Sequence, residues 1–586
     1  VQTESTLDAA DGDVATLQLF NIEYREQFGD PRVHLWCRDK GGKQHHVAVD
    51  GHRPSFYIHE DANSRRIRNH QWVESVERGY SSIHDDPLVK IETSLPKHVG
   101  GGYDIEKGLR EYFEQTWEAD VFYTDRFLID SGIKTHFRVD TSEAVSNQHI
   151  DADYLVSMDD IEAVADPSWS VDPKILTIDI EVESPDGFPE AEDADYPVTA
   201  IAAHSNYRES FRVWVLANEE YTDRDEIKHA VKTGQPSDIC VQAGGDTKTV
   251  ASTIDEVRVF TDETAMLDNF NRTVSEVGAD ILSGWNSSET DNGDAFDYPY
   301  LINRCRSLNV SSFDQWSPFG QIWTTRRGRS QNLTVDGKGV TFLDGMVMYR
   351  KTMWSEPDGG MSLSNISEIE LPSDATKLSL EDETPEGVSD TEAIDWAWRN
   401  DMELFGKYVV RDTQATVAID RASGASQLYQ NLRKLTGAKF DACNNNIDLL
   451  DHYILRFAHD EGIVLPTNTV PDRDWFYGGH VFDPEFGRHE NAVYPDVWSE
   501  YPNAFRTCNL SPETIIGTKE DLEQSEYTEN DCRWSYIDTR PDNVKNPDDM
   551  KGFSTVYSFQ MDLPRGVSTK MMLKNTTAFS EVIYQD

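Results

Sequence analysis

The segment ILTIDIEV, residues 175–182, places two carboxylates inside an otherwise apolar stretch. Apolar residues alternate with Thr177, Asp179 and Glu181, which is the period of a β-strand, so both carboxylates belong to one face of that strand. Two carboxylates side by side on a rigid strand repel each other and are stable when they are solvated or hold cations. Their hard oxygen atoms favour Mg²⁺ or Mn²⁺. On this segment alone, a half-exposed edge strand and a metal site explain the pattern equally well.

Two later segments carry further carboxylates. ADILSGWN, residues 279–286, predicts a strand that leads into a loop, and FDYPYLINRC from Phe296 predicts a helix with Asp297 at its N-terminus. In KYVVRDTQATVAID, Tyr408 and Asp412 are four residues apart and share one helix face. Asp297 alone is consistent with a helix cap, and a Tyr-x₃-acidic spacing is common in a chain with 105 acidic residues. The information therefore lies in the order of the three elements.

A strand with Asp-x-Glu, then Gly-Trp-Asn with Phe-Asp, then Tyr-x₃-Asp resembles the RNase H-like DEDD exonuclease domain of family B DNA polymerases. The resemblance implies that Tyr408 orients an attacking water, and that in-line hydrolysis of a phosphodiester uses two divalent metals. The family usually has three residues between the Asn and the Phe-Asp pair, whereas nine separate Asn286 from Phe296 here. By the same resemblance, the two Mg²⁺ or Mn²⁺ ions are held by Asp179, Glu181, Asp297 and Asp412.

Two downstream segments resemble the polymerising half of the same family. YGGHV, which contains Tyr477, Gly478 and Gly479, is similar to the YxGG element, and this implies contact with template DNA. DVWSEYPNAFRTCNLSPET is similar to the first palm motif. That similarity implies a polymerase metal ligand at Asp496, in a second site with two Mg²⁺ ions, and a nucleotide-binding ring at Tyr501.

The palm segment also departs from the family pattern. Glu500 stands where the family has Leu, and Pro495 removes a hydrogen-bond donor from an expected strand. The fingers signature and the second palm motif are absent, because YIDTRP has Arg540 where the last Asp would stand. We therefore expect a polymerase that is truncated before the fingers. A stand-alone 3′→5′ exonuclease and a DNA-binding scaffold with a decayed palm are the alternatives.

A chain of 586 residues is too long for one core, and we expect an α/β multidomain protein. A strand-rich opening is followed by alternating strands and helices, then by a helical stretch and a new region. The predicted domains are an N-terminal domain (1–165), the exonuclease domain (166–424), a helical return to the N-terminal domain (425–465) and the start of a palm (466–586).

The net charge of −51 is extreme for a protein expected to bind DNA, because phosphates attract Lys and Arg. Concentrated salt reconciles this negative charge with DNA binding. The Debye length at 1 M ionic strength is only ~3 Å, so distant like charges hardly repel one another. The charge favours a halophilic source over a merely acidic protein, and the resemblance is to the archaeal type of the family. Acidic and polar runs such as SSETDNGDA and LEDETPEGVSDTE are expected to be solvated loops.

The sequence also predicts the compartment and the partners. No run approaches the roughly 18 apolar residues of a membrane span, and the first residues lack the basic and apolar regions of a signal peptide. The six cysteines form no CxxC pair, so neither a zinc site nor a disulfide framework is indicated. We expect a cytoplasmic protein. The implied partners are primer-template and single-stranded DNA, deoxynucleoside triphosphates for the full-length protein, and a sliding clamp as a further candidate.

Overall fold

The chain divides into two compact units. The first comprises Val1–Arg25, Arg32–His52 and Ser131–Tyr453, and the second comprises Glu26–Pro31, Arg53–Asp130 and Ile454–Asp586. The computed structural model describes residues 14–468, except 64, 142–151, 186, 291–292, 329, 381–382, 386–387 and 389. Beyond 468 it describes residues 486–493, 495–496, 499–501, 503, 515–517, 523, 532–538 and 553–559.

The segment ILTIDIEV forms strand β10 (Ile175–Val182), as its alternation predicts, near the middle of a six-stranded sheet in the first unit. The strand order is β15-β12-β11-β10-β16-β19. β10 runs antiparallel to β11 and parallel to β16. The neighbouring strands are largely buried, as is typical of a sheet covered on both faces. Their bounds are β11 Val198–Ser205, β12 Ser210–Leu216, β15 Ile254–Phe260, β16 Ile281–Gly284 and β19 Thr341–Asp344.

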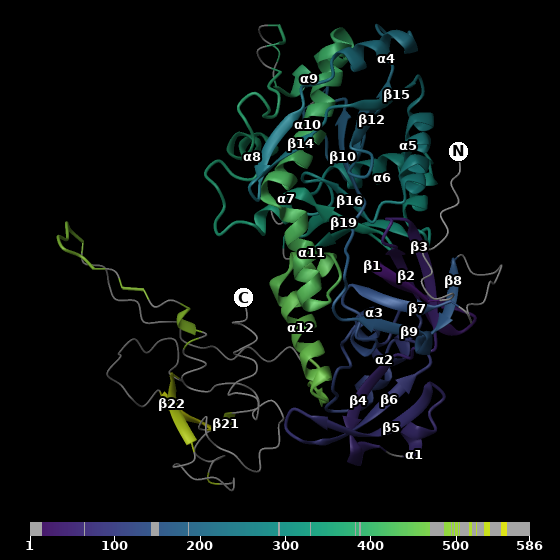
Figure 1. Ribbon diagram of the computed structural model, residues 1–586, viewed down its shortest axis with the longest axis vertical. Helices are drawn as coiled ribbons and strands as arrows, with labels where there is room; N and C mark the ends of the chain where they lie inside the picture. Colours follow the sequence, from purple (N-terminus) through teal and green to yellow (C-terminus); the bar gives the residue numbers. More distant parts are fainter. Residues whose placement is uncertain are drawn as a thin grey trace. The chain divides into compact units, whose positions relative to one another are not determined.

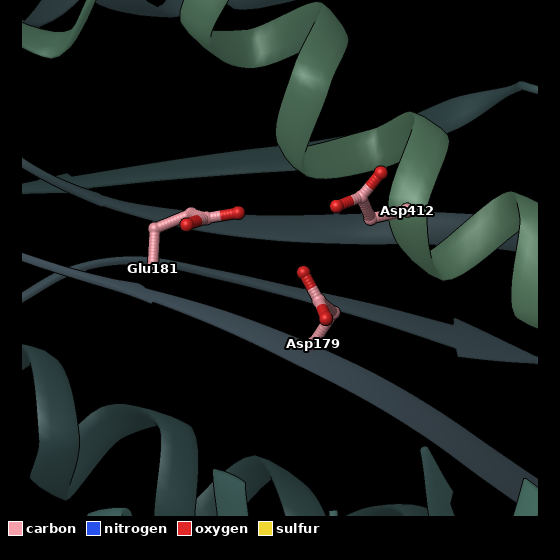
Figure 2. Close-up of side chains that lie close together, drawn as sticks. All are labelled: Asp179, Glu181 and Asp412. Atoms are coloured by element: carbon pink, nitrogen blue, oxygen red, sulfur yellow. The ribbon is translucent and has the colours of Figure 1, made fainter. Parts of the chain in front are cut away.

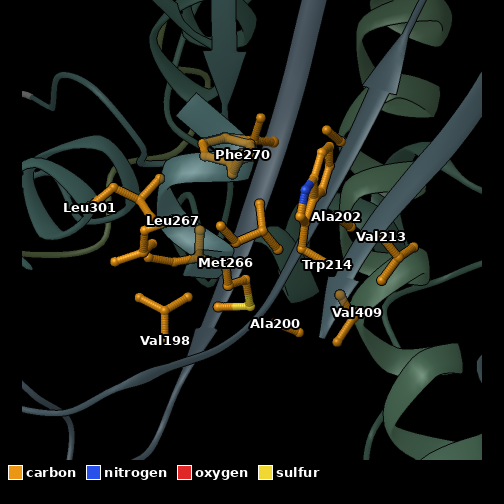
Figure 3. Close-up of a cluster of buried hydrophobic side chains, with 14 of the residues drawn as sticks. Val198, Ala200, Ala202, Val213, Trp214, Met266, Leu267, Phe270, Leu301 and Val409 are labelled. Atoms are coloured by element: carbon orange, nitrogen blue, oxygen red, sulfur yellow. The ribbon is translucent and has the colours of Figure 1, made fainter. Parts of the chain in front are cut away.

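Helices cover both faces of this sheet (Figure 1). On one face Trp214 packs edge-on against Phe270 of α5, with ring centroids 5.2 Å apart, in the core shown in Figure 3. Ala202 and Val213, register partners on β11 and β12, belong to the other face, toward α10. Because Asp179 is the register partner of Ala202, the carboxylates of β10 also face α10. The helix bounds here are α5 Glu263–Val277, α6 Asp297–Ser307 and α10 Met402–Ser423.

Further hairpins and helices belong wholly or in part to the first unit. Two hairpins are formed by β13 (Ile239–Ala243) with β14 (Asp246–Val250), and by β17 (Ile322–Arg327) with β18 (Asn332–Gly337). The remaining helices are α4 Arg224–Thr233, α7 Gly345–Arg350, α8 Leu363–Glu370, α9 Asp390–Asn400, α11 Ala425–Thr436 and α12 Asn446–Asp460.

A second six-stranded sheet, formed by N-terminal residues, has the order β8-β3-β2-β1-β7-β9. Arg38 at the end of β2 forms a buried ion pair with Asp280, which immediately precedes β16, so the two sheets of the first unit are joined by a charged contact. The strand bounds are β1 Val14–Gln27, β2 Asp30–Arg38, β3 Gln44–Asp50, β7 His136–Asp140, β8 Tyr154–Ser157 and β9 Ile161–Val164.

The second unit contains a four-stranded sheet of order β20-β5-β6-β4. Its strands are β4 Ser55–His59, β5 Val73–Ser82, β6 Pro87–Thr93 and β20 Ile463–Val464, with helices α1 Arg65–Arg68, α2 Lys97–Gly100 and α3 Tyr123–Asp130. A small sheet of order β21-β23-β22 comprises Ile515–Gly517, Phe553–Phe559 and Cys532–Asp538. In the part of the chain that the structure describes, no helix has the length and apolar character needed to cross a bilayer.

Candidate active site

Three carboxylates converge between β10 and α10 (Figure 2). Asp179 and Glu181 come from one face of β10, and Asp412 comes from the facing side of α10. One oxygen from each of the three lies within 4.8 Å of the others, which is close enough to share a cation. Asp179 is half-buried, whereas Glu181 and Asp412 are buried. The strand and the helix thus bring together residues that lie more than 200 positions apart in the sequence.

Asp297 is the first residue of α6, as its position after Phe296 predicts. Its Oδ1 accepts a hydrogen bond of 3.0 Å from the backbone N–H of Ile180, the residue between Asp179 and Glu181 on β10. The side chain is buried, and its charge acts on Asp179, but it does not belong to the group of three convergent carboxylates. The structure therefore places Asp297 beside the cluster, bound to the strand that carries it.

Electrostatics show that this cluster is unfavourable as it stands. Burial raises the pKa of Asp179, and the charges of Asp297, Glu181 and Asp412 raise it further. Burial and Asp412 likewise raise the pKa of Glu181. Burial also raises the pKa of Asp297, to about 7. Carboxylates held this close lose part of their affinity for protons when a cation neutralises them, so the arrangement suits a divalent metal ion.

Lys377 is a site residue that the sequence analysis missed. Its Nζ donates to Oδ2 of Asp412 at 2.5 Å and lies 5.2 Å from the ring centroid of Tyr408. Burial opposes the charge of this ammonium, but Asp412, Tyr408 and Asp179 together hold its pKa well above the ordinary value. No sequence signal distinguishes Lys377, because it lies 35 residues before Asp412 and outside any of the spaced motifs.

Tyr408 lies on the same face of α10 as Asp412, as their spacing predicts, and it is buried. Burial raises the pKa of Asp412, while Lys377 and a hydrogen bond from Tyr408 lower it. The phenol and the ammonium therefore both stabilise the charged form of the one carboxylate that the helix contributes.

The start of the loop after β10 is held by helix α9. Oδ2 of Asp395 accepts a hydrogen bond of 2.9 Å from the backbone N–H of Ser184, and Arg399 pairs with Glu183. Phe188 of this loop is 72% exposed, and its ring lies 4.7 Å from that of Phe296, next to Asp297. An exposed aromatic ring therefore packs against the residue that precedes Asp297, in a segment whose start is held by α9.

The nine-residue spacing after Asn286 leaves Asp297 in place for a visible reason. The backbone N–H of Phe296 donates to the carbonyl of Asn286 at 2.9 Å, so the two ends of the insertion meet. The expectation of a solvated loop is wrong for its first part, because Ser287 and Ser288 are buried. Their backbone N–H groups donate to the Asp344 carboxylate at 2.6 and 3.1 Å, and this satisfies the buried polar backbone.

The predicted polymerase residues are only partly covered by the structure. Asp496, Glu500 and Tyr501 are exposed. The element with Tyr477, Gly478 and Gly479 lies outside the described residues, and so does Arg540. The roles of Asp496 and Tyr501 stay predictions.

Two family descriptions match this chain in consecutive order. Residues 114–366 match the exonuclease domain of DNA polymerase family B, and residues 446–555 match DNA polymerase family B itself. The first match ends before Tyr408 and Asp412, so the contribution of α10 to the cluster comes from the structure.

Several known proteins are similar to the chain. A DNA-directed DNA polymerase of Escherichia phage RB69 is 25% identical over 354 residues, covering 59% of this chain and 36% of the phage protein. A DNA polymerase of Thermococcus litoralis is 29% identical over 270 residues, covering 44% of this chain and 14% of that protein. The Drosophila melanogaster DNA polymerase delta catalytic subunit is 24% identical over 503 residues, covering 78% of this chain and 42% of the fly protein. The chain thus spans less than half the length of each of these relatives.

A solved structure supports the same fold. The family B DNA polymerase from the hyperthermophilic archaeon Pyrobaculum calidifontis superposes with a TM-score of 0.58 and 17% identity, covering 95% of this chain and 62% of that one. The predicted α/β multidomain fold is confirmed by this likeness, and the two sequence matches lie in the predicted order along the chain. The chain belongs to DNA polymerase family B, and it contains the family's exonuclease domain and part of its polymerase domain.

Proposed function

We propose that the first unit removes nucleotides from the 3′ end of DNA by metal-dependent hydrolysis, and that the full protein is a proofreading DNA-directed DNA polymerase. The observation that carries the proposal is the convergence of Asp179, Glu181 and Asp412 within 4.8 Å, on the exonuclease strand and on the helix that faces it. Metal-dependent exonuclease chemistry requires this kind of oxygen-rich, negatively charged site.

The donor set fits Mg²⁺ or Mn²⁺, which bind carboxylate oxygens in preference to softer ligands. Asp179, Glu181 and Asp412 would hold two such ions with the help of Asp297. When bound, they supply an activated water and stabilisation of the phosphate charge. Tyr408 orients the water through its hydroxyl, and Lys377 holds Asp412 in position.

The proposal is tested with single-stranded DNA labelled at its 5′ end, so that loss of 3′ nucleotides gives a ladder of shorter labelled products. The purified chain is expected to produce this ladder with Mg²⁺ or Mn²⁺ and to produce none with a chelator. A second substrate with a phosphorothioate at the last linkage serves as a control for hydrolysis from the 3′ end. Labelled mononucleotide as the first product would instead indicate attack from the 5′ end and would refute the proposed direction.

The polymerase half extends the proposal to the complete protein. Asp496 would bind a metal ion, Tyr501 would contact the incoming deoxynucleoside triphosphate, and Tyr477, Gly478 and Gly479 would contact template DNA. Primer-template DNA is the proposed substrate, a sliding clamp is a proposed partner, and the cytoplasm is the proposed compartment. The relatives that share this architecture are named DNA polymerases.

Phe188 is proposed to stack on a base at the 3′ end of the strand, because it is exposed and packs against Phe296, the residue before Asp297. Base–aromatic stacking contributes roughly 1–3 kcal/mol per base. Phe188→Ala should therefore raise KM for single-stranded DNA about tenfold with a smaller change in kcat, and Phe188→Trp should retain the wild-type KM. Phe122→Ala, which removes a ring of similar exposure (74%) in the second unit, is the matched control. Equal KM values for Phe188→Ala and wild type would show that this ring does not contribute to binding of single-stranded DNA.

We also propose that the protein works in concentrated salt, because its net charge is −51. Self-repulsion of this size weakens as salt screens it. The melting midpoint, followed by circular dichroism, should be higher in 2 M than in 0.1 M KCl. Sucrose at matched osmolarity controls for general solvent exclusion, which also stabilises proteins. A higher midpoint at 0.1 M KCl would contradict the halophilic interpretation.

A further inference from the structure

A cavity of about 490 Å³ lies in the first unit beside the carboxylate cluster, and the proposed hydrolysis makes no use of it. Its floor is formed by β10, β11 and β16, and its walls by α7, α10 and α11. Thr177 of the floor is two residues before Asp179 on the same strand face, which is roughly 7 Å along the strand. Thr416 of the wall is one helical turn after Asp412. The cavity therefore extends the space between sheet and helix away from the carboxylates.

Three polar side chains form a row across the floor. His204 of β11 and Ser283 of β16 are both register partners of Thr177 on the central strand, so all three project from the same face of the sheet. Their exposed fractions are only 1%, 3% and 6% for His204, Ser283 and Thr177. A polar row in the middle of a buried sheet is costly unless its hydrogen-bonding groups are used.

These groups have hydrogen-bonding capacity left over. Nε2 of His204 is fully buried and has no hydrogen-bond partner within the described part of the chain. Burial lowers the pKa of His204 to about 3, so the ring is neutral at physiological pH and offers one donor and one acceptor. Beside this ring on the floor lie the hydroxyls of Thr177 and Ser283, each of which can donate and accept a hydrogen bond.

The walls combine apolar surface with charged side chains, of which Arg421 and Glu209 form an ion pair. Ile175, Met348 and Val417 supply apolar contacts. Arg421 donates to both carboxylate oxygens of Glu209 at 2.8 and 2.6 Å. The guanidinium of Arg421 is therefore already paired.

Asp420, a further wall residue, accepts hydrogen bonds from the backbone N–H and the hydroxyl of Ser426, both at 2.8 Å. Lys248 of β14 also lines the cavity, and it is exposed. It has no ion-pair partner among the described residues, although its charge lowers the pKa of Asp420, whose pKa burial raises. An exposed cation therefore stands beside the Asp420 carboxylate at the edge of a polar-floored cavity.

We propose that this cavity binds a nucleoside 5′-monophosphate, with its base against the row of His204, Thr177 and Ser283 and its phosphate toward Lys248. The volume lies in the range of small-molecule sites, about 300–1,000 Å³, and is far larger than a single cation needs. A planar base has donors and acceptors on its edge for the floor and flat faces for Ile175 and Val417. An acyl chain would leave the polar row without partners.

The ligand class rests on the proposed function in one respect, because nucleoside monophosphates are the products of the proposed exonuclease. Binding itself needs neither the metal ions nor hydrolysis. The two ideas can therefore fail separately: loss of hydrolysis with retained binding would refute only the exonuclease, and the reverse would refute only this site.

The test is a calorimetric titration of dAMP into the whole chain in the presence of a chelator, so that no metal-dependent binding at the carboxylates contributes. One saturable site is expected. His204→Leu and Thr177→Val, which remove hydrogen-bonding groups at similar volume, should each weaken binding about fivefold. Lys248→Ala should weaken dAMP binding by at least as much and leave the weaker binding of deoxyadenosine unchanged.

Two kinds of control distinguish a specific site from non-specific binding. Lys232→Ala removes an exposed lysine of α4 that does not line the cavity, and it should leave the affinity for dAMP unchanged. Melting midpoints of His204→Leu and Thr177→Val identify any variant that fails to fold, and Lys248→Ala on the exposed hairpin keeps the test independent of the core. Absence of saturable binding would overturn the proposal. So would affinities that none of the three variants changes, or competition by inorganic phosphate as strong as by dAMP.

Discussion

Asp179→Asn is expected to lower the rate of 3′-end hydrolysis by about 10³-fold or more. The substitution keeps the shape of the side chain but removes one of the three convergent carboxylates. Metal ions contribute several kcal/mol of charge stabilisation in such reactions, and each 1.36 kcal/mol corresponds to tenfold in rate. The ladder assay on 5′-labelled single-stranded DNA measures the effect.

Glu256→Gln is the matched control for this experiment. Glu256 lies on β15 of the same sheet, outside the carboxylate cluster. The variant should therefore hydrolyse 3′ ends at the wild-type rate. Binding of single-stranded DNA should persist in Asp179→Asn, which distinguishes lost chemistry from lost substrate affinity. A variant that shortens DNA as fast as wild type would exclude Asp179 from the site.

The same substitution should have the opposite effect on stability when no metal is bound. The pKa of Asp179 is raised in the folded protein, so its ionised form opposes folding. The stability associated with protonated Asp179 is fully present at pH values below the pKa of this group in the unfolded chain. It is lost as the pH rises through the pKa of the group in the folded protein. In chelator, Asp179→Asn should therefore melt at a higher temperature than wild type at pH 8, and the difference should shrink as the pH falls. Mg²⁺ should reverse the order at pH 8.

The sequence predicted the local structure of the site well, because each element carries its own periodicity. The alternation in residues 175–182 predicted a strand with both carboxylates on one face, and the structure confirms it. The four-residue spacing of Tyr408 and Asp412 predicted a shared helix face, and α10 places both toward β10. Asp297 begins α6 as expected. These predictions depended only on short-range geometry.

Contacts between distant segments could not be predicted in this way. Lys377 reaches Asp412 from a stretch with no helical or strand period, so only the folded chain brings them together. The run LEDETPEGVSDTE was expected to be a solvated loop, yet its last residues begin α9, which ties down the loop after β10. The same limit applies to Ser287 and Ser288, whose burial depends on Asp344, a residue more than fifty positions away.

The ion pair between Arg38 and Asp280 depends just as strongly on long-range contacts. The guanidinium donates from Nε and Nη2 to the two carboxylate oxygens at 2.6 and 3.0 Å, and both side chains are almost completely buried. Arg38 also donates to the carbonyls of Gly42 and Gly278, and the backbone N–H of Lys174 donates to Asp280. Burial raises the pKa of Asp280 even though Arg38 lowers it, so the attraction does not fully offset the loss of hydration.

Breaking this pair on one side should therefore be far more costly than replacing it whole. Asp280→Ala is expected to lower the free energy of unfolding by about 3–5 kcal/mol, because it leaves the guanidinium buried without its partner. Arg38→Met should lower the free energy of unfolding by a similar amount, because it leaves the Asp280 carboxylate buried without its partner. The double variant Arg38→Met/Asp280→Leu should lose much less than the sum of the single losses, since neither charge is then buried.

Urea unfolding in 2 M KCl measures all three variants against wild type. The exposed pair of Arg272 and Asp268 on α5 provides the control, and Asp268→Ala should change the free energy of unfolding by less than about 1 kcal/mol. Single variants as stable as this control would mean that the two sheets of the first unit are held together by apolar packing alone. A double variant that loses the full sum would mean that Arg38 and Asp280 act through their separate backbone partners, Gly42, Gly278 and Lys174, and not through each other.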